Sequence, residues 1–174
     1  DETTGEVRPF RCKSWNCPAH RRSLAWSWAF KVAQARPERM VTLTNIPKDR
    51  QDALYAFQHL VRDLRKRGPF EYVRFFEVGS KTGMYHYHLG QRGEFVPQRL
   101  LSSVASKNGL GKVVDIRQCH GEGPGFYMSK YISKGLDDHP FGWRKVSASK
   151  GFWGPREAPS ESEPGWVLMT HRGT

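Results

Sequence analysis

Two strand-like segments joined by a short turn constrain the fold of this chain most strongly. Residues 70–79, FEYVRFFEVG, are rich in aromatic and β-branched side chains, and residues 84–89, MYHYHL, have the pattern of a returning strand. The turn between them, residues 79–83, begins and ends with glycine. A connection this short places the two strands side by side and antiparallel. The sequence therefore predicts a β-hairpin in the middle of the chain.

Two helices are expected before the hairpin, each with one apolar side. In the first, over residues 18–36, Leu24, Trp28 and Val32 recur at four-residue spacing and form one stripe. The second covers residues 49–67. Its apolar side is expected to comprise Leu54, Phe57, Leu60, Val61 and Leu64.

Helical and strand patterns alternate along the rest of the chain. Together with the tight hairpin, this alternation predicts an α+β fold in which helices pack on a largely antiparallel sheet. The remaining expected elements are a strand over 39–45, a helix over 96–107, a strand over 111–119, a helix over 126–134 and a strand near 143–148.

The charge of the chain points to a polyanionic partner. Lys and Arg number 28 and Asp and Glu number 17, which gives a formal net charge of +11 over 174 residues. This length suits one domain with a substantial core. No apolar run approaches the length that spans a membrane, so we expect a soluble protein with no membrane partner. Three cysteines are too few for a disulfide framework, which favours a reducing, cytoplasmic setting.

Two histidines on the second hairpin strand are candidates for a metal site. In His86-Tyr87-His88 one residue separates the imidazoles, and alternating side chains on a strand share a face. Glu77 lies nine residues before His86, with the turn between them, so the hairpin can bring its carboxylate beside the imidazoles. Two imidazoles and one carboxylate form a mixed N/O site that suits Mg²⁺ or Mn²⁺ acting on a phosphate. The alternative is a pair of ordinary, half-exposed strand histidines.

A second motif, YMSKYISK at residues 127–134, repeats the unit Tyr-X-X-Lys. Residues four apart on a helix are neighbours on one face, so Tyr127 and Tyr131 form one stripe. Lys130 and Lys134 form a second stripe close by. A tyrosine hydroxyl can attack a phosphodiester and become covalently joined to it, while a nearby lysine favours the phenolate or holds the phosphate. The alternative is an amphipathic helix with tyrosines at the edge of the core and solvated lysines.

Taken together, these motifs resemble those of the HUH endonucleases. The His-X-His motif is similar to their His-hydrophobic-His motif, and YMSKYISK looks like the paired-tyrosine motif of rolling-circle replication initiators of small single-stranded DNA phages. MVTLTN resembles the strand motif that precedes both. FFEVGSKTGMYHYHL resembles the initiator hairpin in which a Glu upstream completes the metal site. Order and spacing agree over roughly residues 12–153.

The resemblance implies a ferredoxin- or RRM-like sheet of about five antiparallel strands, with the tyrosine helix laid against the metal site. It implies an HUH domain over residues 1–155, with a tail over 156–174. The implied activity is metal-dependent nicking of single-stranded or hairpin origin DNA through a 5′-phosphotyrosine intermediate, followed by rejoining, in rolling-circle replication within a bacterial host cell. No helicase motif is seen, so a host or phage helicase is an expected partner. Either tyrosine could be the first nucleophile, with a slight preference for Tyr127.

A cysteine-containing segment near the N-terminus is a candidate structural zinc site. RCKSWNCPAHRR contains Cys12, Cys17 and His20, and its Cys-X-X-His part has ligand spacing. Similar phage initiators carry cysteines just before the first helix, which supports this hypothesis. Cys119 or His120 could supply a fourth ligand. The alternative is two free cysteines and a surface histidine.

Basic and aromatic residues indicate a surface that contacts DNA. Basic clusters on the second helix and near the C-terminal end can contact phosphates. Residues 142–153, GWRKVSASKGFW, mix tryptophan with basic and small residues, which suits a flap that grips single-stranded DNA by stacking and charge. The alternative for such charges is simple solvation. The candidates are Arg62, Arg65, Lys66, Trp143, Arg144, Lys145, Lys150 and Trp153.

Other classes of protein share some of these features. A transposase of the two-tyrosine type would use the same chemistry. A non-catalytic RRM-like domain that binds single-stranded nucleic acid would explain the charge and the aromatic residues, yet would leave the histidines and paired tyrosines as coincidence. A hydrolase that uses water as nucleophile would form no covalent DNA adduct.

Overall fold

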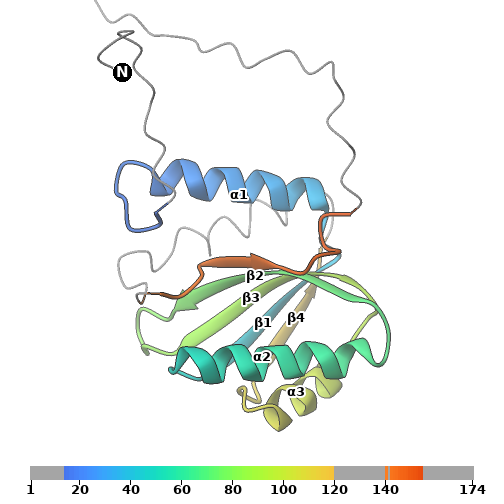
Figure 1. The fold of residues 1–174 in the computed structure, drawn as a ribbon. Helices are drawn as coiled ribbons and strands as arrows, with labels where there is room; N and C mark the ends of the chain where they lie inside the picture. Colours follow the sequence, from blue (N-terminus) through green and yellow to red (C-terminus); the bar gives the residue numbers. More distant parts are fainter. Residues whose placement is uncertain (1–13, 120–139, 141, 155–174) are drawn as a thin grey trace, which may run out of the picture.

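A five-stranded antiparallel sheet forms the centre of the part of the chain that the structure describes, residues 14–119, 140 and 142–154 of a computed structural model (Figure 1). The strands lie in the order β4-β1-β3-β2-β5, and each neighbouring pair is antiparallel. The predicted α+β class and the sheet of about five strands are therefore confirmed. The elements are α1 (Arg21–Ala35), β1 (Arg39–Ile46), α2 (Arg50–Arg65), β2 (Phe70–Val78), β3 (Tyr85–Gly93), α3 (Gln98–Lys107), β4 (Val114–Gln118) and β5 (Val146–Ala148).

The predicted hairpin lies within this sheet, between β1 and β5. β2 and β3 pair from Phe70 opposite Gly93 to Val78 opposite Tyr85, without a bulge. Gly83 in the turn has φ 62°, in the left-handed region that glycine enters without steric cost. β3 continues beyond its predicted end at residue 89, because its last residues gain backbone partners in β2 that their own side chains do not announce.

The sheet separates two helical layers. α1 covers one face, and α2 and α3 cover the other (Figure 1). Adjacent residues of one strand serve opposite cores: Phe75 belongs to the core on the α1 side, and Phe76 belongs to the core on the α2 side. The α2 side holds the larger core, in which Phe57 of α2 packs edge-to-face against Tyr87 of β3.

The face that α1 turns to the sheet differs from the prediction. Its buried residues are Ala25, Ala29 and Val32, whereas Leu24 and Trp28 are only partly buried. Alanine lets the helix axis approach the strands closely, which a stripe of leucine and tryptophan would prevent. The predicted stripe was correct only at Val32, because four-residue spacing defines several adjacent stripes and only the packing partner selects one.

The apolar side of α2 is close to the prediction, with one error. Phe57, Leu60, Val61 and Leu64 are buried as expected, together with two alanines. Leu54 is 36% exposed and lies at the margin of the helix–sheet contact. The helix begins after Asp49, whose Oδ1 accepts hydrogen bonds from the backbone amides of residues 51 and 52.

Several predicted segments are longer than the elements observed. The segments over 18–36, 96–107 and 111–119 lose two or more residues at their N-terminal ends. Before β4, the Gly111 amide donates to the Thr44 carbonyl, so the chain approaches β1 there without yet joining its ladder. The predicted strand near 143–148 is confirmed as the short edge strand β5.

Two predictions concern residues outside the described part of the chain. The helix over 126–134 and the tail over 156–174 both lie there, so the division into domain and tail stays a prediction. Among the helices that the structure describes, none has the length and apolar character needed to cross a membrane.

The contrast between Leu60 and Leu54 gives a test of the packing on α2. Leu60 is fully buried, so Leu60→Ala should lower the free energy of unfolding by about 2–5 kcal/mol. Leu54→Ala removes the same atoms from the margin of the helix and should cost no more than about 1 kcal/mol. Urea denaturation of both variants measures the difference. Equal losses would contradict the placement of α2.

Candidate active site

Three polar side chains of the hairpin share the sheet face that α1 covers. Glu77 in β2 lies directly opposite His86 in β3, and His88 follows two residues later. Phe75, which pairs with His88, belongs to the core beneath α1, so the three side chains point to that face. The hairpin therefore brings all three predicted metal ligands to one side of the sheet.

His88 is held between two polar neighbours. Its Nε2 lies 2.5 Å from Glu77 Oε2, and its Nδ1 lies 3.2 Å from the Thr42 hydroxyl in β1. The side chains of His88 and Glu77 are only 7% and 13% exposed. An ionised carboxylate only accepts hydrogen bonds, so Nε2 carries a proton in this arrangement and the neutral ring accepts from Thr42 at Nδ1. The imidazole is thereby fixed in both position and tautomer.

His86 lies beside this pair, nearer the turn. Its ring centroid is 6.3 Å from that of His88, and the planes are inclined by 29°. Burial lowers the pKa of His86, and the positive charge of His88 lowers it further, while Glu77 acts in the opposite direction. A Cβ at Gly79 would stand 3.1 Å from His86 Nε2. Glycine at position 79 therefore leaves the space that this imidazole occupies.

Lys145, at the start of the edge strand, is an unusual neighbour of the site. It was predicted to contact DNA, but its side chain is 1% exposed and does not lie on the open surface. Burial lowers the pKa of Lys145 to about 8, and the charge of Glu77 partly opposes this shift. A buried ammonium group near the Glu77 carboxylate adds positive charge to the site.

The donor atoms suit a divalent cation, although their arrangement is not that of a complete metal cage. Among the described residues, no group of three or more His, Cys, Asp or Glu side chains surrounds a common point. The Glu77 carboxylate instead contacts His88, with His86 alongside. Two imidazole nitrogens and one carboxylate on one face remain a chemically suitable set for Mn²⁺ or Mg²⁺.

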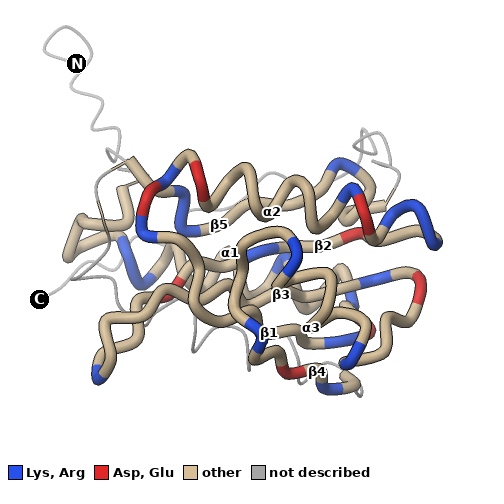
Figure 2. The backbone as a smooth tube through the Cα atoms, turned by 90° about the horizontal axis from the view of Figure 1, so that it is seen from below, with Lys and Arg blue, Asp and Glu red and all other residues tan. Residues whose placement is uncertain are grey.

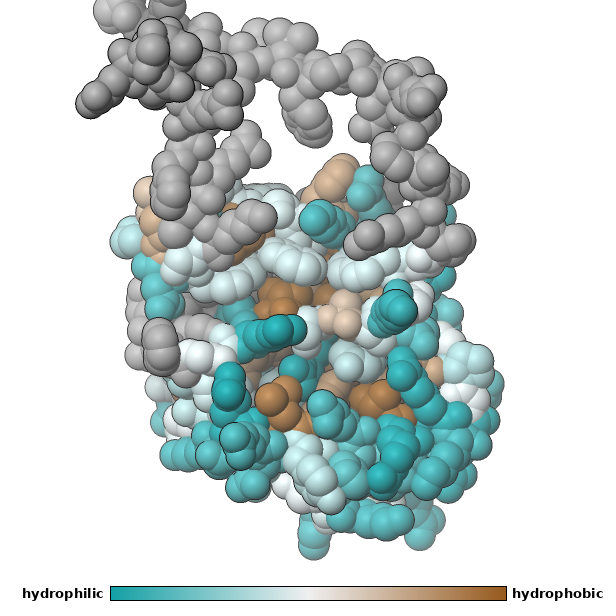
Figure 3. All heavy atoms as spheres, viewed as in Figure 1, coloured by the Kyte–Doolittle hydropathy of each residue, from teal (hydrophilic) through white to brown (hydrophobic). Residues whose placement is uncertain are grey.

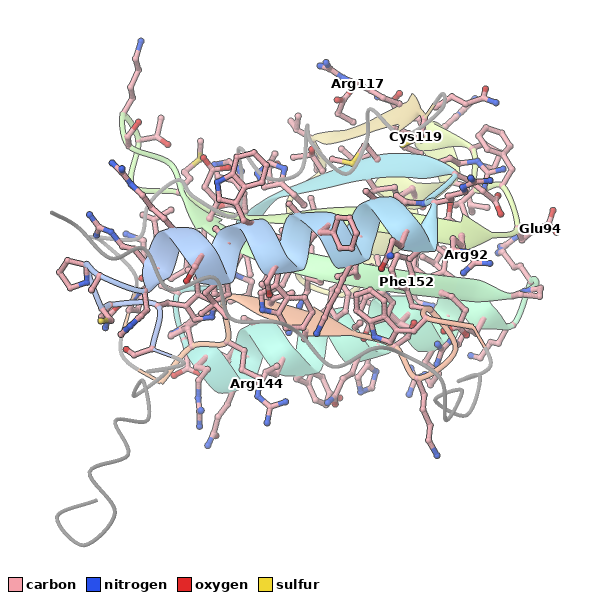
Figure 4. All side chains as sticks on the ribbon, turned by 90° about the horizontal axis from the view of Figure 1, so that it is seen from above. Arg92, Glu94, Arg117, Cys119, Arg144 and Phe152 are labelled. Atoms are coloured by element: carbon pink, nitrogen blue, oxygen red, sulfur yellow. The ribbon has the colours of Figure 1, made fainter. Side chains whose placement is uncertain are left out.

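Other predicted site residues are only partly described. Tyr127, Lys130, Tyr131 and Lys134 lie outside the described residues, as do Cys12 and His120. Cys17 Sγ lies 3.4 Å from His20 Nδ1, so two of the three predicted zinc ligands are adjacent. Cys119, at the β4 edge (Figure 4), packs against the α1-side core, and burial raises the pKa of its thiol to about 11.

The basic residues at the end of α2 are engaged by acidic neighbours. Arg65 Nη2 lies 3.0 Å from Glu71 Oε1, and Lys66 Nζ lies 3.1 Å from Asp63 Oδ1. Arg62 Nε is 3.5 Å from the same Asp63 oxygen. The hydrogen bond from Lys66 is the main reason that the pKa of Asp63 falls to about 2. Lys and Arg are spread over the elements seen in Figure 2 and do not form one basic face.

The two tryptophans predicted to grip DNA occupy different surroundings. The Trp143 ring centroid is 4.5 Å from that of Phe76 and 5.2 Å from that of Tyr85, so it packs on the end of the hairpin. Trp153 is 38% exposed and lies against Trp28 of α1. The predicted basic residues Arg144 and Lys150 are exposed.

Sequence reasoning missed Thr42, Gly79 and Arg74. Thr42 could have been found from its place in the alternating strand MVTLTN, once β1 was paired with β3. Gly79 was identified only as a turn residue, although it also makes room for His86. Arg74 is a buried arginine in the middle of β2, and nothing in the local pattern distinguishes it from a solvated residue.

The sequence of the chain also matches a family model. The model, described as replication-associated protein ORF2, matches residues 38–136, more than half of the 174-residue chain. The chain belongs to this family. No curated protein and no solved structure matches the chain.

The family match covers the strands that carry the candidate site. In this replication-associated protein it includes β1 to β4, and with them Thr42, Glu77, His86 and His88. It also includes the predicted tyrosine segment, residues 127–134. α1 and β5 lie outside the match, so Lys145 comes from a part of the chain that the family model does not cover.

The contacts of His88 predict one tautomer for its neutral ring. Because Glu77 accepts from Nε2, long-range ¹H–¹⁵N NMR should show the proton on Nε2 and a bare Nδ1. Thr42→Val should shift the Nδ1 resonance, because it removes the hydroxyl donor. Thr44→Val, which removes a hydroxyl bonded to the Val113 carbonyl, is the matched control and should leave His88 unchanged. A proton on Nδ1 would contradict the geometry.

Proposed function

We propose that this replication-associated protein is a replication initiator of the HUH type, which nicks single-stranded origin DNA with a tyrosine and rejoins the ends. The observation that carries the proposal is the placement of Glu77, His86 and His88 on one sheet face, with a Glu77–His88 contact of 2.5 Å, in a chain of the replication-associated family. A pure binding domain would not need a buried carboxylate–imidazole pair at this point.

The residues that would hold a divalent cation are Glu77, His86 and His88. Mn²⁺ or Mg²⁺ bound there would polarise the scissile phosphate and withdraw charge from it in the transition state. The Thr42 hydroxyl both donates and accepts hydrogen bonds, so it can support His88 in either tautomer. When Nε2 of His88 is free to act as a ligand, the proton sits on Nδ1 and Thr42 accepts it.

The chain supplies positive charge around the phosphate as well. Lys145 is buried near Glu77, where burial strengthens its electrostatic effect. In our proposal its ammonium group stabilises the site while Glu77 remains ionised. The exposed Arg144 beside it in sequence is placed to contact the DNA as it approaches.

The proposed nucleophile is the hydroxyl of Tyr127 or Tyr131. Its oxygen forms a bond to phosphorus while the bond from phosphorus to the 3′ oxygen breaks. Overall, the phenolic proton passes to the departing 3′ oxygen, which leaves a 5′-phosphotyrosine and a free 3′ hydroxyl. Lys130 and Lys134 would favour the phenolate, whose parent phenol has a pKa of about 10. Reversal of this step by a 3′ hydroxyl rejoins the DNA.

The proposed substrate is single-stranded or hairpin origin DNA, with unwinding supplied by a separate helicase. The formal charge of +11 favours a polyanion, and the family assignment connects that polyanion with replication. A small structural zinc site built from Cys12, Cys17 and His20 remains part of the proposal. The adjacency of Cys17 and His20 supports it.

The covalent step can be tested directly. Tyr127→Phe combined with Tyr131→Phe should abolish the DNA adduct seen on denaturing gels with Mn²⁺, while binding of the oligonucleotide persists. Tyr55→Phe, at an exposed tyrosine of α2, is the control and should leave adduct formation intact. Cleavage that continues in the double variant without an adduct would indicate water as nucleophile and would overturn the proposal.

The requirement for a cation gives a second test. Chelation should stop cleavage, and Mn²⁺ or Mg²⁺ should restore it. His86→Ala should lower the cleavage rate at least about 100-fold, since a Lewis acid contributes several kcal/mol to such a reaction. His59→Ala removes a half-buried histidine of α2 and should have little effect. Near-normal cleavage by the His86 variant would exclude His86 as a ligand.

A further inference from the structure

A cavity of about 370 Å³ lies on the opposite side of the sheet from the candidate active site. It is formed between the N-terminal half of α2 and the edge strand β5 with the residues before it. Its volume falls in the range of about 300–1,000 Å³ that is usual for ligand-binding clefts. Figure 3 looks at this edge of the molecule, where hydrophobic side chains are exposed between hydrophilic ones.

The lining of this cavity combines arginine with aromatic side chains. Arg50, Arg74 and Arg144 line it, and Asp and Glu are absent from its described lining residues. Tyr72 and Trp143 supply aromatic surface. Arginine recognises phosphate and stacks on planar rings, and bases stack on aromatic side chains, so this composition suits a nucleotide.

Arg74 is the strongest sign that the cavity is a built site. Its side chain is 6% exposed, and its guanidinium carbon lies 4.3 Å from the ring centroids of both Phe57 and Tyr87. Its Nε donates to the Ser147 hydroxyl at 3.1 Å. No carboxylate pairs with it among the described residues, although an unpaired buried charge is costly. An anion in the cavity would balance this charge.

The cavity adjoins the back of the hairpin end. Trp143, one of its walls, packs on Phe76 and Tyr85, which immediately precede Glu77 and His86. Arg144 lies at the β5 edge beside α2 (Figure 4), and the next residue, Lys145, is buried near Glu77. The edge strand therefore has one basic side chain toward each face of the sheet. A DNA strand that passes around this edge can contact both.

We propose that this cavity binds one nucleotide of the single-stranded DNA substrate, with its phosphate held by Arg74 and Arg144 and its base against Trp143 and Tyr72. The inference deepens the proposed function, because it names a second contact point for the same strand. It requires that the protein bind single-stranded DNA, but it does not require that the protein cut it.

Binding of a fluorescein-labelled 15-nucleotide oligo-dT, followed by fluorescence anisotropy, tests the arginine contacts. Arg144→Ala and Arg50→Ala should each weaken binding about tenfold, since a charge-assisted hydrogen bond to phosphate is lost. Each should also reduce the slope of log affinity against log salt by about 0.7. Arg117→Ala, at the opposite edge of the sheet (Figure 4), removes the same charge and should change the affinity less than about twofold.

Arg74→Met separates a binding role from a structural one. Methionine fills the space between Phe57 and Tyr87 without a buried charge, so thermal unfolding should occur at the same temperature or higher. Binding of the oligo-dT should nevertheless weaken about tenfold. Unchanged affinity in a folded Arg74→Met variant would overturn the proposal. If this variant does not fold, the exposed Arg50 and Arg144 variants still decide the matter.

Photocrosslinking locates the strand independently of affinity. An oligo-dT that carries one 5-iodo-deoxyuridine should crosslink to the peptide that contains Trp143 or Tyr72, as identified by mass spectrometry. Equal losses of affinity in the Arg144 and Arg117 variants, or crosslinks confined to the α1 face, would overturn the cavity assignment. His86→Ala should bind and crosslink normally, so loss of cleavage alone bears on the active site and not on the cavity.

Discussion

The register between β2 and β3 is the constraint on which the rest of this structure depends. It places Glu77 opposite His86 and sends both, with His88, to the face beneath α1. Side chains alternate along a strand with a period of two, so a slip of one residue would turn the carboxylate away from the imidazoles. The same slip would expose Phe76, which anchors the core on the other side. The hydrophobic packing of the hairpin and its polar site therefore enforce one another.

The two faces of the sheet have different duties. The α2 side carries most of the core, with Phe57 and Tyr87 in edge-to-face contact. The α1 side has a smaller core built on alanines, which leaves polar side chains such as Thr42 and Glu77 near the helix layer. A thin core beside a polar site suits a surface that must admit a substrate, while the thick core opposite keeps the strands in place.

Buried positive charge marks both sides of the β5 edge. Lys145 lies near Glu77 on one side, and Arg74 lies between two aromatic rings on the other. Burial lowers the pKa of each group, which shows that keeping these charges inside costs the protein stability. A protein that handles a phosphate backbone gains from such charges, because they act most strongly where water is excluded. The family assignment to replication-associated proteins is consistent with that use.

By itself the sequence determined the α+β class, the hairpin and the three polar residues on it, because period-two alternation and a short turn leave few arrangements. It did not determine which stripe of α1 is buried, nor that Leu54 is displaced from the core of α2, since helical spacing is compatible with adjacent stripes. Only the tertiary structure decided that Thr42 supports His88 and that Lys145 and Arg74 are buried. These contacts join strands far apart in the chain, and their physical cause is sheet pairing and packing, which local sequence does not encode.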